Sequence, residues 1–230
     1  MIEEPKQLTV KNKRNRPTAE QIEAFKDVQT GFVVDAMHGA GALQTHIAPL
    51  DPTNARTIYG PALTVENGPA DILATLGALT CITPGDIVIS SVEAHQGCAA
   101  AGDRVTGMMK NCGAIGFVTD GPMRDFEGIK AVGLPCWCTG LNPGSPFSKG
   151  PGKIGFPISL GGQAISSGDM IVADRDGVVV VPFAQIDQVL AALENVKRLE
   201  TELDAEVAAG LKVPQAILEL MESEEVDYRD

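Results

Sequence analysis

The apolar residues of this chain fall into short runs that glycine and proline interrupt. Runs such as 87–89, 114–119 and 178–181 have the length and flanking turn residues of buried β-strands. The exception is a helical repeat of apolar residues between 186 and 203, which predicts one long amphipathic helix. No apolar run reaches the roughly 18 residues that cross a bilayer. We therefore expect a soluble α/β protein without a membrane segment.

Turn and capping residues divide the chain into alternating helices and strands. Thr18 and Gln21 form a capping-box pattern, so we expect a helix that begins there and ends at Gly31, followed by a second over 33–37. The other expected elements are strands over 57–66, 87–89 and 114–119, helices over 71–79 and 99–110, small strands between 154 and 181, and a short helix over 213–221.

Neither an internal repeat nor a long linker divides these elements. A chain of 230 residues is long enough for one sizeable core. We expect a polar N-terminal arm over 1–17, a single domain over 18–221 and an acidic tail over 222–230. The arm holds a basic cluster that we interpret as solvated, formed by Lys11, Lys13, Arg14 and Arg16.

Charge and cysteine content restrict the partners and the compartment. The net charge is −12, whereas nucleic-acid binding requires a basic surface. The five cysteines form no regular framework, and the first residues lack the apolar region of a secretory signal. We therefore expect a cytoplasmic protein that binds neither nucleic acid nor membrane. Such an acidic protein can bind an anion only where a cation, an arginine or a helix N-terminus supplies local positive potential.

Three charged residues stand at the edges of a predicted helix–strand unit. Asp103 begins a helix, and Arg124 and Asp125 directly follow a buried strand, where ligands collect in α/β sheets. Two carboxylates suit Mg²⁺ or Mn²⁺, which take oxygen ligands and need only one or two from the protein. An arginine fork matches a carboxylate or a developing enolate. The set therefore suits a 2-oxo acid held on a divalent cation. The alternative is a surface ion pair between Asp103 and Arg124.

The residues around Asp103 suit a carboxylate. Gly102 permits close approach of a ligand, and the N–H groups of residues 103–105 at the start of the helix are free to bind an anion.

The sequence Gly-Phe-Val-Thr-Asp-Gly-Pro-Met-Arg-Asp at 116–125, with Asp103 twenty residues before Arg124, resembles a family hallmark. The family is that of the 4-hydroxy-4-methyl-2-oxoglutarate / 4-carboxy-4-hydroxy-2-oxoadipate aldolases, which are related to the regulators of ribonuclease activity A (RraA-like). Segments 84–89 and 168–182 resemble further family blocks in the same order.

The resemblance implies a fold, an assembly and a reaction. The fold is α/β, a swivelling phosphohistidine-domain-like β/β/α core with flanking N- and C-terminal helices. The assembly is a homotrimer or hexamer with active sites between subunits. The reaction is that of a class II, metal-dependent aldolase, which cleaves a 4-hydroxy-2-oxo acid to pyruvate and a second carbonyl compound, with oxaloacetate decarboxylation as a side activity.

The resemblance also implies residue roles. Gly102, Asp103, Arg104 and Val105 are expected to bind the substrate carboxylate, and Arg124 to contact the 2-oxo oxygen. Asp125 is expected to hold Mg²⁺ (or Mn²⁺), partly through water, while Asp103 orients Arg124 or a metal-bound water. A neighbouring subunit's C-terminal helix would contribute one of three acidic residues, which are Glu194, Glu200 and Glu202.

Two departures from the family pattern bear on substrate choice. The segment before Gly102 reads His95-Gln96-Gly97-Cys98, and Arg104 stands where the family has an apolar residue. Arg104 either binds a distal carboxylate of the substrate at the rim of the pocket or pairs with an acidic neighbour on the surface.

Other signals are weaker. The string Gly-Pro-Gly-Lys-Ile-Gly at 150–155 matches a dinucleotide fingerprint, but Pro157 is incompatible with the helix that such a motif opens. Cys136 and Cys138 with His95 and Cys98 lack zinc-site spacing. The alternatives to the aldolase are a non-catalytic, protein-binding RraA-like regulator and a lyase of the same fold acting on a different oxo acid. The intact acid–Arg–Asp set favours the enzyme.

Overall fold

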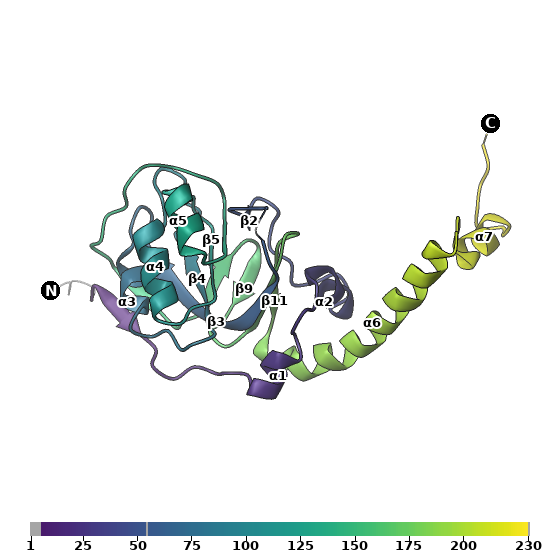
Figure 1. The fold of residues 1–230 in the computed structure, drawn as a ribbon, viewed down its shortest axis with the longest axis horizontal. Helices are drawn as coiled ribbons and strands as arrows, with labels where there is room; N and C mark the ends of the chain where they lie inside the picture. The colour runs from purple at the N-terminus through teal and green to yellow at the C-terminus, as the bar shows by residue number, and fades with distance from the viewer. Residues whose placement is uncertain (1–5, 54, 230) are drawn as a thin grey trace.

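The computed structural model describes residues 6–53 and 55–229 and shows an α/β fold (Figure 1). The first five residues of the predicted N-terminal arm and the last of the predicted acidic tail lie outside the described residues. In the described part nine strands form one sheet, in the order β1-β7-β3-β4-β5-β6-β2, with β10 and β11 continuing from β3. The strands are β1 (Leu8–Val10), β2 (Ala48–Pro49), β3 (Ile58–Asn67), β4 (Ile87–Ser91), β5 (Gly116–Thr119), β6 (Cys136–Cys138), β7 (Gly152–Ile154), β10 (Met170–Ala173) and β11 (Val178–Val181), and a hairpin is formed by β8 (Ile158–Leu160) and β9 (Gln163–Ile165).

The long strand β3 joins the two parts of the sheet. Its first residues pair antiparallel with β10, in the register Ile58↔Ala173 to Pro61↔Met170. Its later residues pair parallel with β4 on one edge and antiparallel with β7 on the other. Strands β3, β4, β5 and β6 run parallel to one another, so their carboxyl ends lie at the same edge of the sheet.

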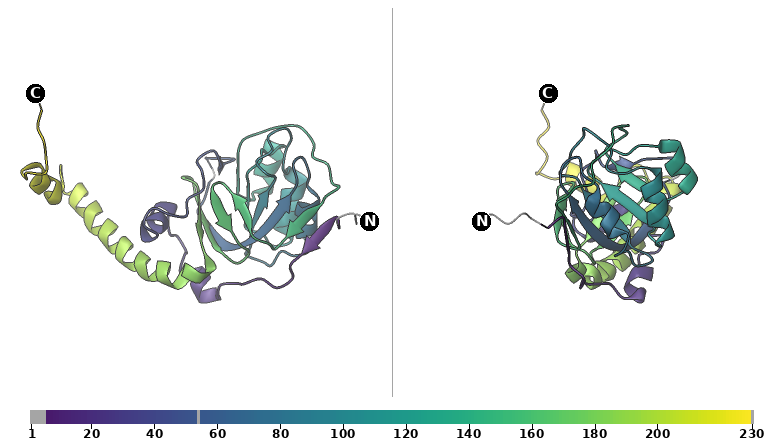
Figure 2. Two further views of the ribbon diagram at one scale, coloured as in Figure 1. Left: turned by 180° about the vertical axis from the view of Figure 1, so that it is seen from behind. Right: turned by 90° about the vertical axis from the view of Figure 1, so that its left-hand side faces the viewer.

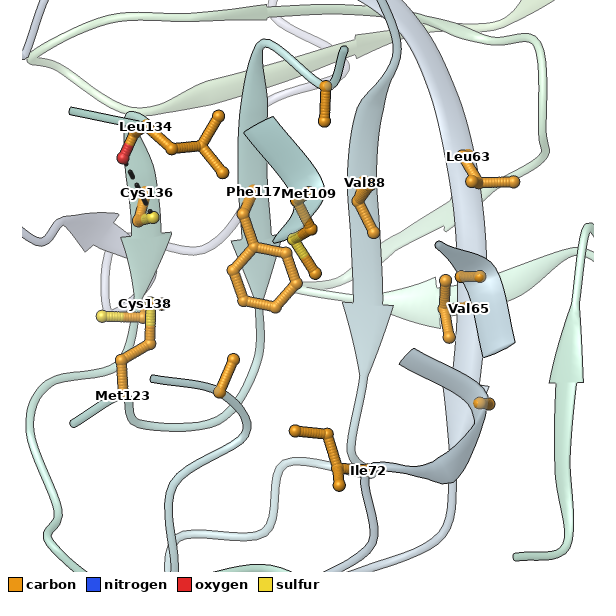
Figure 3. Packing of buried hydrophobic residues seen from close by; sticks show 14 of the residues in the cluster. Leu63, Val65, Ile72, Val88, Met109, Phe117, Met123, Leu134, Cys136 and Cys138 are labelled. Atoms are coloured by element: carbon orange, nitrogen blue, oxygen red, sulfur yellow. Dashed lines mark hydrogen bonds between the residues drawn. The ribbon is translucent and has the colours of Figure 1, made fainter. Parts of the chain in front are cut away.

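Three helices connect these parallel strands and cover one face of the sheet (Figures 1 and 2). The helices are α3 (Leu73–Ala78), α4 (Asp103–Asn111) and α5 (Phe126–Val132). Leu63, Val88 and Phe117 are neighbours across three strands, and Figure 3 shows them on the face that Met109 of α4 covers. All four side chains are at most 1% exposed, so this apolar layer positions the three helices on the sheet.

Helices α1 (Ala19–Glu23), α2 (Thr30–Ala36), α6 (Ile186–Ala208) and α7 (Gln215–Met221) lie outside this layer. The expected capping box at Thr18 is confirmed, but the expectation that the first helix ends at Gly31 is wrong. The helix ends earlier, and Gly31 lies inside α2. The buried carboxylate of Asp174 explains why α2 begins at Thr30, because it accepts hydrogen bonds from the Thr30 N–H (2.9 Å) and hydroxyl (2.8 Å).

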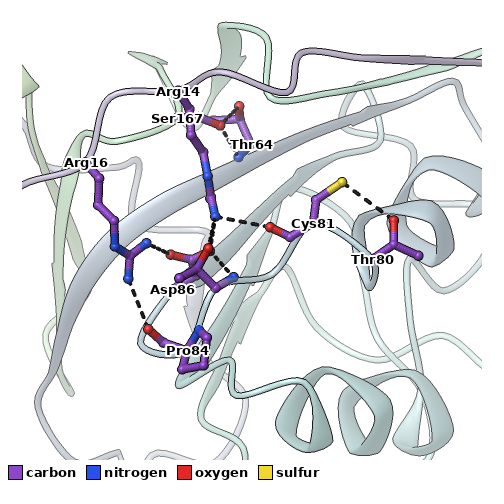
Figure 4. A network of polar contacts seen from close by, with 9 residues as sticks. Arg14, Arg16, Thr64, Thr80, Cys81, Pro84, Asp86 and Ser167 are labelled. Carbon is purple, nitrogen blue, oxygen red and sulfur yellow. Dashed lines mark hydrogen bonds and ion pairs between the residues drawn. The ribbon is translucent and has the colours of Figure 1, made fainter.

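The interpretation of the basic cluster as solvated is wrong for Arg14 and Arg16. Both guanidinium groups bind the carboxylate of Asp86, which is fully buried (Figure 4). The Arg14 Nη2 lies 2.6 Å from one carboxylate oxygen, and the Thr83 N–H donates to the same oxygen at 2.8 Å. Lys11 is exposed, as expected. The preceding residues pair with β7 as strand β1, so this part of the arm is fastened to the sheet at two points.

Helix α6 confirms the predicted long amphipathic helix, but only its first turns are packed. Ile186, Val189 and Leu193 are buried, whereas Leu199 and Leu203 are 48% and 44% exposed. Figures 1 and 2 show the helix projecting from the rest of the molecule, with α7 at its far end. None of the helices in the described ranges is both long and apolar enough to cross a membrane.

Candidate active site

The loops that follow the four parallel strands meet at one edge of the sheet and enclose a cavity of about 460 Å³. Residues from all four loops, after β3, β4, β5 and β6, contribute to its wall. The lining consists of Ile72, Leu76, Ala101, Gly102, Asp103, Arg104, Val105, Arg124, Asp125, Ser145, Pro146 and Ser148. The structure therefore brings together all six predicted site residues, those at 102–105 and Arg124 and Asp125.

The buried carboxylate of Asp120 joins the loop after β4 to the loop after β5. It accepts hydrogen bonds from the N–H groups of Val92 (2.7 Å) and Ala94 (3.0 Å) and from the Ser91 hydroxyl (3.0 Å). Glu93 and Ala94 have φ values of 54°, a left-handed conformation that is strained for residues other than glycine. The Asp120 contacts hold this strained turn in place.

Asp103 is the first residue of α4, as predicted, and its carboxylate lies against α5. One carboxylate oxygen accepts a hydrogen bond from the Arg104 N–H at 2.7 Å. A Cβ on Gly128 would come within 2.5 Å of the other oxygen, so only glycine leaves room for Asp103 at that point of α5. In the described part of the chain Asp103 forms no ion pair with Arg124, so the alternative of a surface pair is wrong.

The N-terminus of α4 is open toward the cavity. Among the described residues, the N–H groups of Asp103 and Val105 have no hydrogen-bond acceptor. Unpaired N–H groups at the start of a helix carry partial positive charge and bind anions. Since both residues line the cavity, this end of α4 can hold a carboxylate.

Asp125 stands before α5 in a left-handed conformation, with φ 62° and ψ 47°. Aspartate tolerates this conformation better than most residues, and such strain concentrates at functional sites. The carboxylate lies beside Gly102, where a Cβ would be 2.4 Å from its Oδ2. It also lies 3.4 Å from the Nε of Arg124, and both side chains remain partly open to solvent. Gly102 is therefore needed for close packing of the two loops.

Ser145 is a site residue that sequence reasoning missed. Its hydroxyl accepts a hydrogen bond from the Arg124 Nη1 at 2.5 Å, so the guanidinium is held at both ends, by Asp125 and by Ser145. The segment that carries Ser145 is fastened by buried Asp71, whose carboxylate accepts from the N–H groups of Lys149 (2.7 Å) and Gly150 (3.0 Å). The proline- and glycine-rich sequence around Ser145 carries no local signal of this contact.

The donor set fits a Mg²⁺ or Mn²⁺ ion. Asp125 and Asp103 line the same cavity and offer the hard carboxylate oxygens that such ions take. A cation with few protein ligands keeps several waters or is completed by its substrate, as Mg²⁺ does.

The residues of the weaker zinc hypothesis have other environments. The Cys136 thiol donates to the Leu134 carbonyl and the Cys138 thiol to the Gly140 carbonyl. Burial raises the pKa of both thiols, which opposes the thiolate form that zinc requires. His95 does not line the 460 Å³ cavity; it borders a separate small hollow with Cys98.

Comparison with known proteins identifies the family of this chain. The family model described as RraA-like (Aldolase/RraA) matches residues 30–180, which include all six predicted site residues. The chain belongs to the aldolase/RraA family. This confirms the resemblance drawn from the 103–125 region.

The relatives include proteins named as aldolases and proteins named as RNase inhibitors. A protein of Halalkalibacterium halodurans named as a candidate 4-hydroxy-4-methyl-2-oxoglutarate aldolase is 35% identical over 87% of this chain and 94% of its own length. The solved structure of Streptomyces coelicolor RraAS2, titled an unusual member of the RNase ES inhibitor RraA family, has a TM-score of 0.74 at 25% identity and covers 83% of this chain and 100% of its own. The predicted α/β fold is thereby confirmed.

A third comparison supports the fold alone. A Thermus RNA-processing inhibitor RraA has a TM-score of 0.62 at 19% identity, over 68% of this chain and 93% of its own.

The contact between Ser145 and Arg124 yields the first prediction. Ser145→Ala is expected to lower kcat by about tenfold for the carbon–carbon lyase reaction that we propose for this site below, because a hydrogen bond to a charged group is worth about 1.5–3 kcal/mol and Ser145 is solvent-exposed. Because Arg124 keeps its charge and loses only a contact that orients it, KM should change less than kcat, and Ser145→Thr should restore most of the rate. The control is Ser159→Ala, an exposed hydroxyl on β8. Unchanged kcat in Ser145→Ala would show that Ser145 does not position Arg124.

Proposed function

We propose that the protein is a divalent-metal-dependent lyase that cleaves the C3–C4 bond of a 4-hydroxy-2-oxo acid and releases pyruvate. The observation that carries the proposal is the meeting of Arg124, Asp125 and the open N-terminus of α4 on one cavity. This arrangement provides donors for a carboxylate, a fixed guanidinium for a developing negative charge, and carboxylate oxygens for a cation. The family and the aldolase name of the H. halodurans relative support it.

In this proposal each group has one task. The N–H groups of Asp103 and Val105 bind the substrate carboxylate, and Arg124 binds the 2-oxo oxygen. A bound Mg²⁺ or Mn²⁺ ion at Asp125 would supply positive charge for the same oxygen. A water hydrogen-bonded to Asp103 accepts the proton of the C4 hydroxyl, and the C3–C4 electron pair moves into the enolate. Arg124 stabilises that enolate, and protonation at C3 gives pyruvate.

The same enolate arises when oxaloacetate loses carbon dioxide, so we propose oxaloacetate decarboxylation as a second activity. Both activities are tested by one assay, in which pyruvate release is measured over a panel of 4-hydroxy-2-oxo acids and oxaloacetate with and without Mg²⁺. Release from at least one 4-hydroxy-2-oxo acid is the expected result. If no member of the panel yields pyruvate with Mg²⁺ or Mn²⁺ present, the proposed reaction is wrong.

Metal dependence is a separate prediction. Excess chelator is expected to lower pyruvate release by about a hundredfold or more, because a metal Lewis acid contributes several kcal/mol of charge stabilisation. Mg²⁺ or Mn²⁺ should restore the rate, while a sodium salt of equal ionic strength should not. The loop 120–125 holds no lysine that would form a Schiff base as the alternative electron sink. Full turnover in excess chelator would contradict the assignment.

We also propose that copies of this chain assemble as a trimer or hexamer. In the described chain the distal part of α6, the segment that follows it and α7 carry apolar side chains that are 38–57% exposed, namely Leu199, Leu203, Val207, Val213, Ile217, Leu218, Leu220 and Met221. A projecting apolar surface of this kind is typical of an interface. Glu194 and Glu202 are exposed on the same helix, and Glu202 pairs with Arg198 at 2.7 Å. They and Glu200 remain the candidates for reaching a neighbouring site.

The second candidate is a non-catalytic regulator, which the structural likeness to RraAS2 favours. A binding protein of that kind has no need of a cavity with a fixed guanidinium and a metal-binding carboxylate. The panel assay separates the two, because a regulator releases no pyruvate from any member.

A further inference from the structure

Gln96 stands outside the wall of the 460 Å³ cavity, in the loop after β4, and its side chain joins three loops at this edge of the sheet. Its amide nitrogen donates to the carbonyl of Ala94 in the same loop at 3.0 Å and to the carbonyl of Asp120 in the loop after β5 at 2.9 Å. Its amide oxygen accepts a hydrogen bond from the hydroxyl of Thr139, in the loop after β6, at 2.7 Å. One side chain therefore binds the three loops that carry most of the cavity wall.

These partners fix how the carboxamide of Gln96 is turned. A carbonyl oxygen can only accept a hydrogen bond, so the two carbonyls require the NH₂ group on their side. The hydroxyl of Thr139 can donate, and it takes the remaining oxygen. A carboxylate of the same shape would place a negatively charged oxygen against two carbonyl oxygens. Glutamine therefore suits this junction and glutamate does not.

The backbone of Gln96 belongs to the same junction. Its carbonyl accepts a hydrogen bond from the side-chain amide of Asn142 at 2.9 Å. The Asn142 N–H donates to the carbonyl of Met123 at 2.9 Å. The Asn142 side-chain oxygen accepts from the N–H of Gly144 at 2.8 Å. The loop after β6 is thereby bonded to Gln96 on one side and to the loop after β5 on the other.

The junction lies one residue away from both members of the contact that orients the guanidinium. Met123 directly precedes Arg124, which donates to the hydroxyl of Ser145 at 2.5 Å. Gly144 directly precedes that serine. A shift of the loop after β6 relative to the loop after β5 would therefore separate the two side chains. Small displacements of a group that contacts the reacting atoms lower the rate strongly.

We propose that Gln96 is a positioning residue, whose carboxamide holds the loops after β5 and β6 in the register that keeps Arg124 against Ser145. The inference rests on the proposed function for the reaction whose rate Arg124 controls. It extends the site to a residue beyond the cavity wall, in the segment 95–98 that departs from the family pattern.

A double-mutant cycle tests this role. Gln96→Glu alters an exposed side chain and is expected to lower kcat for pyruvate release by about tenfold while KM changes less than about twofold, because it misplaces a group that acts in the transition state. If Gln96 acts through the contact between Ser145 and Arg124, the loss must be smaller in a Ser145→Ala background, so the two losses do not add.

The matched control is Gln163→Glu on β9, where the amide also donates to a backbone carbonyl, that of Ala42 at 3.0 Å. This variant should keep the wild-type kcat and KM. An unchanged kcat in Gln96→Glu, a rise in KM that accounts for the whole loss, or strictly additive losses with Ser145→Ala would overturn the inference.

A second measurement needs no turnover. The N–H groups of Met123, Asn142 and Gly144 are hydrogen-bonded, so they exchange with solvent when the junction opens. In Gln96→Glu, hydrogen exchange of segments 120–125 and 139–147, followed by mass spectrometry, is expected to be about threefold or more faster, whereas Gln163→Glu should leave it unchanged.

Unchanged exchange in Gln96→Glu would also overturn the inference. If no substrate yields pyruvate even with the wild-type protein, the proposed reaction fails and hydrogen exchange alone decides whether Gln96 holds the two loops. Faster exchange in both segments would then support its positioning role.

Discussion

Replacement of Arg124 by alanine is expected to lower kcat/KM for pyruvate release by about a thousandfold or more. The guanidinium is held between Asp125 and Ser145, so it is oriented before the substrate arrives. Removal of one preorganised donor to a developing oxyanion costs about 3–4 kcal/mol, and here the donor also carries a full charge. The loss should appear mainly in kcat, because the charge on the 2-oxo oxygen develops in the transition state.

Lysine is expected to restore little of this activity. A point charge on a flexible stem cannot contact Ser145, Asp125 and the substrate in the fixed geometry of the guanidinium. The matched control is Arg175→Ala, an exposed arginine in the turn between β10 and β11, which should retain the wild-type rate. A folded Arg124→Ala protein with near-full activity would remove Arg124 from the mechanism and with it the main support for an enolate.

Asp86→Asn is expected to lower the free energy of unfolding by about 3 kcal/mol or more. The carboxylate is fully buried and compensates the charges of Arg14 and Arg16, which are 14% and 33% exposed. A neutral amide leaves both guanidinium groups without a counter-charge. The energetic cost is larger for Arg14, which is less exposed to water than Arg16. For a chain of this size the midpoint of thermal unfolding should fall by about 10 °C. Urea denaturation followed by the fluorescence of buried Trp137 measures the change.

The loss in free energy of unfolding should be larger for the more buried arginine of the pair. Arg14→Ala should destabilise more than Arg16→Ala, since Arg14 is the less exposed partner. Asp176→Asn, which alters an exposed carboxylate in the turn between β10 and β11, is the control and should unfold like the wild type. If Asp86→Asn were as stable as the wild type at equal protein concentration, the contacts in Figure 4 would add nothing to stability.

Much of the site could be predicted because its residues stand next to apolar runs and turn residues that mark the ends of strands and helices in the sequence. The apolar run at 114–119 and the turn at 120–122 locate the end of a buried strand, so the place of Arg124 and Asp125 follows from general rules for parallel sheets. Helix α4 begins at Asp103, as the reading of that residue as a helix start predicts, but the helix expected over 99–110 is wrong at its first four residues, since Gly102 is the N-cap. These features depend on a few neighbouring residues and on the order of elements along the chain.

The features that could not be predicted depend on contacts between distant segments. Ser145 reaches Arg124 only because the loops after β5 and β6 are folded over the same edge of the sheet. Thr30 starts a helix because Asp174 caps it, and no local pattern reveals that partner. Arg14 and Arg16 resemble a solvated cluster in sequence, and only the tertiary fold brings them to Asp86.

The pairing of β3 has a consequence for how the chain folds during synthesis. Residues 58–61 find their partners only at 170–173, and β1 must wait for residues 152–154. Pairings between such distant residues slow folding, since long loops must close before they gain any contacts. Until the ribosome has released these later segments, one edge of β3 exposes unpaired N–H and C=O groups to other chains. The protein is therefore expected to complete its sheet late in translation, with this edge as the surface that a chaperone must protect.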